Sequence, residues 1–326
     1  MNVHQDRWVL RDRPLGPIFA TMSCMRYAIA SFLLLSLAGR SAAQAPDLLL
    51  LPEWKEGQYR TYMVQREGGW PDEPQELTLD TKLEVVGYNI VAYDLDLAVR
   101  NFMIDLAGGA SKDELRDLEE VEWLHIGVSV NKKNGEYTLT GVEDAGEAIE
   151  DAFKMLTKFK KAVDKEAATA YSEEWSAFAE RMADHEDLAT AWFRPIVDLM
   201  TLPLCRSYYL GDTVRNEVEM NISLAADSIL PAVVRRRAVL TDKDREGDEA
   251  TVVELREHPV PPDPDMVAPE DAPEPEFLVK GDLEITYELK EAWPKEGRYD
   301  LATTPKGATE PHTLRLTVTQ TGRSKK

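Results

Sequence analysis

Apolar and polar residues alternate along two long parts of the chain, from about residue 57 to 140 and from about 213 to 320. Alternation with a period of two is typical of strands that bury one face. Pro71-Asp72-Glu73-Pro74 interrupts the first part and separates its opening strand from the next two. The apolar residues of these two strands share one phase each: Leu77, Leu79, Leu83 and Val85 in one, and Tyr93, Leu95, Leu97 and Val99 in the other.

A tight hairpin is predicted between residues 123 and 140. The two alternating segments 123–130 and 136–140 are joined by Asn131-Lys132-Lys133-Asn134-Gly135. An Asn-Gly step favours the positive backbone angles that such turns require. Neighbouring strands in this part are therefore expected to pair in an antiparallel meander.

The pattern changes to a helical period between about residues 143 and 200. Trp175, Phe178 and Met182 are spaced for one helix face, and Leu188, Trp192, Ile196 and Leu199 are spaced for another. Pro195 is expected to kink or split the second of these helices.

These elements predict an α+β fold, with an antiparallel sheet or half-barrel that carries an inserted helical segment. We expect residues 44–326 to form a single domain. Its segment 258–276 is rich in proline and acidic residues, a composition that favours an extended loop.

The N-terminal segment has the features of a secretory signal peptide. Arg26 precedes the apolar run Ala28–Leu37, and Ser41-Ala42-Ala43 supplies the small residues that signal peptidase requires. We expect cleavage near Ala43, although cleavage after Ala45 also fits, and a periplasmic or extracellular location. The residues before Met25 are interpreted as an upstream extension, since Met22 or Met25 makes a more ordinary start. The run is too short for a membrane span of about 20 residues, so no integral membrane anchor is expected after cleavage.

The chain is strongly acidic, with a formal net charge of −21. Residues 1–43 hold five basic and two acidic side chains, so their removal brings the charge to about −24. Nucleic acids are excluded as partners because phosphate binding requires clustered cations. Cys205 is then the only cysteine, which leaves no intramolecular disulfide and suggests a small buried apolar side chain.

The common motifs of catalysis and metal binding are incomplete in this sequence. His185-Glu186 begins like a zinc-protease helix, but residue 189 is alanine instead of the second histidine. Asp242, Asp244 and Glu246 begin like a calcium loop, but its twelfth position is Val253. We therefore expect no metal, no cofactor and no catalytic residue that the sequence can identify. Arg235-Arg236-Arg237 is expected to pair with carboxylates across strands, or else to line an anion site.

Trp175, Phe178, Trp192 and Phe193 form the densest aromatic group of the chain. Two interpretations remain open for them. They form the core between helix and sheet, or they line a groove for an apolar ligand. On the second interpretation these four residues are the candidate ligand-binding residues.

The Trp54-x-x-Gly57-x-Tyr59 segment and the Asn134-Gly135-Glu136-Tyr137 hairpin resemble those of secreted bacterial envelope proteins of uncharacterised function, which have a curved antiparallel sheet and a helical insertion. The incomplete catalytic motifs and the aromatic helices lead us to expect a non-enzymatic envelope protein that binds an apolar small molecule or an envelope protein where the helices meet the sheet. The alternative is a hydrolase of cell-envelope polymers that uses paired carboxylates.

Overall fold

The computed structural model describes most of the residues between 48 and 324. Residues 1–43, where we expect the signal peptide, lie outside the described residues, as do residues 260–275 of the proline-rich segment. The described residues are 48–69, 76–103, 124–152, 154, 165–184, 186–202, 204–225, 228–244, 248–259 and 276–324.

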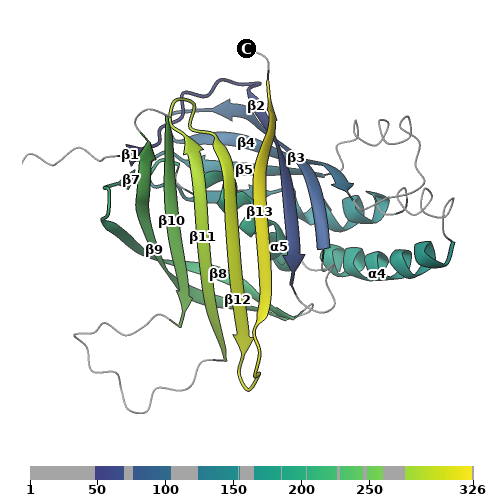
Figure 1. The fold of residues 1–326 in the computed structure, drawn as a ribbon. Coiled ribbons are helices and arrows are strands. Elements are labelled where there is room, and N and C mark those ends of the chain that lie inside the picture. Colours follow the sequence, from purple (N-terminus) through teal and green to yellow (C-terminus); the bar gives the residue numbers. More distant parts are fainter. Residues whose placement is uncertain are drawn as a thin grey trace, which may run out of the picture. The chain divides into compact units, whose positions relative to one another are not determined.

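Eleven of the described strands form one antiparallel sheet (Figure 1). Their order across the sheet is β6-β5-β4-β3-β2-β13-β12-β11-β10-β9-β8, so the last strand pairs with the first long one and joins the two halves of the chain. The strands are β2 (Tyr59–Gly68), β3 (Glu76–Tyr88), β4 (Ala92–Met103), β5 (Leu124–Asn131), β6 (Tyr137–Thr140), β8 (Thr213–Ala225), β9 (Ser228–Asp244), β10 (Glu249–His258), β11 (Phe277–Glu288), β12 (Pro294–Pro305) and β13 (His312–Arg323).

The helical segment lies between the two groups of strands in the chain, as the sequence predicts. It includes η1 (Val142–Asp144), an α-helical segment over residues 145–152, α4 (Lys165–Asp184) and α5 (Glu186–Thr201). Two short strands, β1 (Leu48–Leu49) and β7 (Ser207–Tyr208), pair with each other beside the sheet. An antiparallel sheet with inserted helices is therefore confirmed, and within the described residues β6 and β8 are the two ends of an open strand order.

Alternation places the predicted apolar residues on the covered face of the sheet. Leu79, Val85, Leu97 and Val99 are all fully buried. The Asn-Gly hairpin is also confirmed, since Val130 pairs with Tyr137 across the turn. Local patterns were sufficient to predict the buried face of these strands, because burial of one face fixes the register of a strand.

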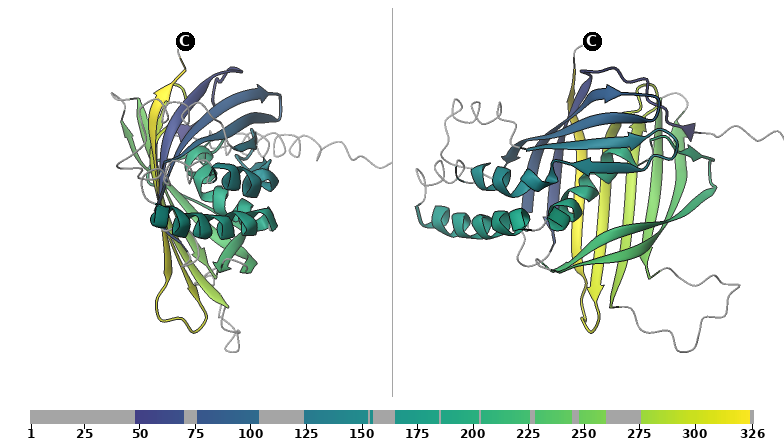
Figure 2. Two further views of the ribbon diagram at one scale, coloured as in Figure 1. Left: turned by 90° about the vertical axis from the view of Figure 1, so that its right-hand side faces the viewer. Right: turned by 180° about the vertical axis from the view of Figure 1, so that it is seen from behind.

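Helix α5 lies against β12, β13 and β8, and every residue of its C-terminal half, Pro195–Thr201, is buried. In the right panel of Figure 2 it lies in front of β12 and β13, with β8 below it. Gly297 on β12 permits this close approach, since a Cβ atom there would lie 3.1 Å from Leu199 Cδ2. Pro195 lies inside the helix, which continues to Thr201, so of the two predicted outcomes, a kink or a split, the split does not occur.

Two apolar clusters fill the space under the helices. The large one joins α5 to β2–β5 and β10–β13. The smaller one links β8, β9 and β11 through buried residues that include Met220, Ile222 and Val234. Leu301 on β12 contacts both clusters, and the space between them opens into a cavity.

Candidate functional site

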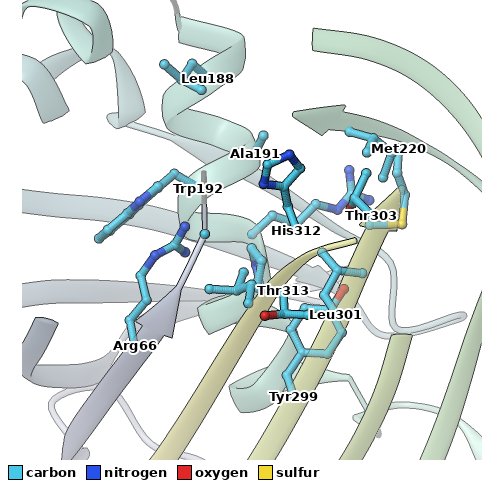
Figure 3. A pocket seen from close by; sticks show the side chains of 15 residues that line it. Arg66, Leu188, Ala191, Trp192, Met220, Tyr299, Leu301, Thr303, His312 and Thr313 are labelled. Carbon is cyan, nitrogen blue, oxygen red and sulfur yellow. The ribbon is translucent and has the colours of Figure 1, made fainter. Parts of the chain in front are cut away.

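A cavity of about 70 Å³ lies between α5 and the strands β2, β8, β12 and β13 (Figure 3). Its walls combine residues that are far apart in the sequence, because α5 is held over strands from both halves of the chain. The lining residues are Arg66 and Gly69; Leu188, Ala191, Trp192, Arg194 and Pro195 of α5; Met220 and Ile222 of β8; Tyr299, Leu301 and Thr303 of β12; and His312, Thr313 and Leu314 of β13.

Trp192 connects the cavity to the aromatic core behind it. Its ring centroid lies 4.7 Å from that of Phe193 in an edge-on arrangement and 5.8 Å from that of Phe178. The guanidinium carbon of Arg66 lies 4.7 Å from the centroid of the Trp192 ring, a cation–π contact. These contacts on several sides of the ring fix its orientation in the wall of the cavity.

Three polar side chains of the lining, Arg66, Trp192 and Arg194, are hydrogen-bond donors only. The indole Nε1 of Trp192 and the Nε of Arg194 are both buried, and neither has a hydrogen-bond partner within the described part of the chain. An indole N–H and a guanidinium N–H can only donate. Figure 3 shows the imidazole of His312 beside Ala191, and the guanidinium of Arg66 near Trp192. The cavity thus offers an apolar space next to groups that favour an acceptor oxygen.

A network of buried charges lies next to this cavity. Arg256 Nη1 on β10 donates to Asp198 Oδ2 on α5 at 2.7 Å, and Arg256 Nε donates to Glu254 Oε1 at 2.9 Å. Arg236 on β9 binds both oxygens of Glu254, at 2.7 and 2.9 Å. The Tyr137 hydroxyl donates to the second oxygen of Asp198 at 2.7 Å. Every carboxylate oxygen of the network is therefore bonded, which buried charges require.

The arginines keep both buried carboxylates ionised. Burial alone raises the pKa of Asp198, but the charges of Arg256, Arg236 and Arg194 outweigh it and leave that pKa lowered. The pKa of Glu254 is lowered in the same way, against the effect of burial, by Arg256 and Arg236. This network holds α5 on the sheet and borders the cavity through Tyr299, whose hydroxyl lies 3.5 Å from Arg256 Nη1.

The four predicted aromatic residues take different positions. Trp192 lines the cavity, whereas Phe178 and Phe193 are buried in the core and are absent from its lining. Trp175 lies on α4, and its side chain is outside the described residues. Sequence reasoning missed the sheet side of the cavity, including Arg66, Tyr299, Leu301 and His312. Tyr299 and Leu301 lie on β12, which was not predicted as a separate strand, and no local pattern indicates which strands α5 would cover.

The three consecutive arginines of β9 pair with carboxylates, which confirms the first of the two predictions made for them. Arg235 lies 3.5 Å from Glu217, Arg237 lies 2.9 Å from Glu257, and Arg236 binds Glu254 as described above. Arg236 faces the covered side of the sheet, while its two neighbours face the other side. Glu254 follows Val253, the twelfth position of the incomplete calcium loop. Its carboxylate binds Arg236 and Arg256.

Among the residues that the structure describes, no group of three or more His, Cys, Asp or Glu side chains is arranged to hold a metal ion. None of the described helices is long and apolar enough to cross a membrane.

Comparison with known proteins identifies no family. No family model matches the chain, and no curated protein matches it. Among solved structures, the chain is similar to one described as "Lipid-protein interactions in lipovitellin", with 11% sequence identity and a TM-score of 0.37. This match covers 83% of the present chain and 26% of the other one, so the chain spans about a quarter of the length of that structure.

Proposed function

We propose that this protein binds an apolar small molecule that carries an acceptor headgroup, and that the cavity between α5 and β12–β13 holds part of it. The observation that carries the proposal is the position of Trp192. Its ring forms an apolar wall, and its buried indole N–H has no partner within the described residues. A buried donor without a partner costs about 1–3 kcal/mol, so a ligand oxygen that accepts from it gains that energy back.

The size of the cavity indicates how much of a ligand it holds. A dry cavity of about 150 Å³ is sufficient for benzene. At about 70 Å³, the present cavity holds a short alkyl segment or a branched chain end, while the remainder of a larger ligand lies at its mouth. This favours a slender aliphatic molecule over one with fused rings.

The groups around the cavity also favour a particular headgroup. Arg66, Arg194 and Trp192 carry only donors, and His312 lies on the neighbouring strand. Such a set is complementary to a carboxylate, which carries only acceptors when it is ionised. A medium-chain fatty acid is therefore the simplest probe of the site, and the corresponding alcohol tests the contribution of the charge.

Calorimetric titration with decanoate and with decanol tests this proposal. We expect decanoate to bind more tightly than decanol. Ala191→Phe places a ring in the cavity and should abolish binding of both, whereas Ala177→Phe, the same change at an exposed position of α4, should leave binding unchanged. Failure of the wild-type protein to bind either molecule, or undiminished binding by Ala191→Phe, would overturn the proposal.

The hydrolase alternative requires a carboxylic acid with a raised pKa facing a second carboxylate. The acids that are fully enclosed in the described structure, Asp198 and Glu254, have lowered pKa values and are bound by arginines. The described residues therefore give this alternative no support. The signal peptide expected in residues 1–43 supports a periplasmic or extracellular site of action for the ligand-binding protein.

A further inference from the structure

An apolar tip protrudes where β3 turns into β4. It comprises Val86, Tyr88, Ile90 and Val91, which are 48%, 57%, 96% and 60% exposed. Ile90 lies at the apex between the two strands, which end at Tyr88 and resume at Ala92. Most large apolar side chains of the neighbouring strand segments are buried, so this group of four differs from the rest of the sheet.

The backbone of the tip is largely hydrogen-bonded within the protein. Asn89 N donates to Ala92 O at 3.0 Å, and the side-chain oxygen of Asn89 accepts from Val91 N at 2.7 Å. Val91 O accepts from Lys132 N at 2.8 Å. The backbone N–H groups of Asn89 and Val91, and the C=O group of Val91, therefore have partners within the protein. In water, solvent can supply such partners, but in hydrocarbon the protein itself must supply them.

A lysine next to the tip completes an arrangement suited to the boundary between lipid and water. Lys132 Nζ donates to Asn89 O at 2.6 Å. The same ammonium lies 4.1 Å from the ring centroid of Tyr93 and 5.4 Å from that of Tyr88. Tyrosine rings and lysine side chains with apolar stems are the groups that occupy the headgroup level of a bilayer. Lys132 and the exposed ring of Tyr88 lie directly behind the aliphatic apex, in the order that shallow insertion requires, whereas Tyr93 is only 7% exposed.

We propose that this tip inserts into the surface of a zwitterionic lipid bilayer and holds the protein there reversibly. A protein partner would need about 800 Å² of contact surface on each side. A narrow protruding turn with one nearly fully exposed isoleucine suits penetration better than such a broad contact. The net charge of −21 opposes binding to anionic lipid, which makes the neutral headgroup the favoured surface. The inference is independent of the cavity under α5.

Co-sedimentation with phosphatidylcholine vesicles tests this inference on the full chain. We expect the wild-type protein to partition onto the vesicles reversibly, with a strength comparable to that of a single acyl chain. Ile90→Asp should lower the partition coefficient by about tenfold or more, since it removes the most exposed apolar side chain of the tip from the lipid. Because Ile90 is 96% exposed, this change should not affect folding.

Leu278→Asp is the matched control, because Leu278 is an exposed leucine of β11 outside the tip. It should leave vesicle binding unchanged. The inference is overturned if the wild-type protein remains in the supernatant, if Ile90→Asp binds as well as the wild type, or if both variants lose binding equally. A dimer in light scattering that Ile90→Asp dissociates, without vesicle binding, would instead identify the tip as a contact between two copies of the chain.

Discussion

Arg256 on β10 and Asp198 on α5 form a buried ion pair, with 2.7 Å between Nη1 and Oδ2. They are 58 residues apart in the sequence, and their side chains are 1% and 3% exposed. The pair connects the inserted helix to the second group of strands. Because α5 also forms one wall of the cavity, the ion pair helps to set the distance between that wall and the sheet.

The first prediction concerns this pair. Arg256→Met keeps most of the side-chain volume but leaves Asp198 and Glu254 buried with fewer positive partners. Loss of one partner from a buried ion pair costs about 3–5 kcal/mol. We expect the free energy of unfolding, measured in urea, to fall by about that amount. Arg315→Met is the control, since Arg315 pairs with Asp300 at an exposed site and should cost at most about 1 kcal/mol. Equal losses in the two variants would contradict a structural role for the buried network.

The second prediction concerns pH. The pKa values of Asp198 and Glu254 are lowered in the folded protein, so the unfolded chain binds protons at these groups more readily. The stability that they contribute is therefore fully present above the ordinary carboxyl pKa of about 4 and is lost as the pH falls through the lowered values.

Urea unfolding at a series of pH values from 7 to 3 measures this effect. Asp198→Asn should reduce the steepness of the decline at acidic pH, because one of the two responsible groups no longer titrates. Asp212→Asn, at an exposed position before β8, serves as the control. An unchanged pH dependence in Asp198→Asn would show that other groups cause the acid sensitivity.

The third prediction concerns the close approach of α5 to the sheet. Gly297→Val should push Leu199 away from β12 and lower the free energy of unfolding by about 1–3 kcal/mol, the usual cost of overpacking. Gly87→Val provides the comparison, since the nearest atom to a Cβ there lies at 3.8 Å. We expect the first variant alone to weaken decanoate binding, because it shifts the helical wall of the cavity. If Gly297→Val bound decanoate as strongly as the wild type, ligand binding in the cavity would not depend on the position of α5.

The fourth prediction concerns the hairpin between β5 and β6. Gly135 and Gly57 both have positive φ angles, 68° and 79°, so alanine introduces similar backbone strain at either position. A Cβ atom on Gly135 would lie 2.2 Å from Leu204 O, whereas none of the described atoms lies within 4 Å of one on Gly57. Gly135→Ala should therefore lower the melting temperature more than Gly57→Ala. If the two variants lowered the melting temperature equally, the protein would accommodate the new Cβ atom beside Leu204 O without a loss of stability.

The strands show which parts of this fold the local sequence pattern predicts. Leu79, Val85, Leu97 and Val99 were assigned to one face by alternation alone, and all four are buried. Strand β12 has a weaker pattern, since it begins and ends at proline and exposes residues such as Lys295 and Glu296. It was not predicted as a separate strand. Its place is decided by pairing on both sides, with β11 and β13.

The sequence by itself determined the strand-helix-strand order, the Asn-Gly hairpin and the helix whose apolar face carries Trp192, because these features depend on residues close together in the chain. Only the tertiary structure decided that Trp192 faces a cavity while Phe178 and Phe193 face the core. It also decided that Asp198 would meet Arg256 and that Ile90 would be left exposed. The physical reason is that burial and charge pairing depend on which distant segments come together, and periodicity reports only which face of an element is apolar.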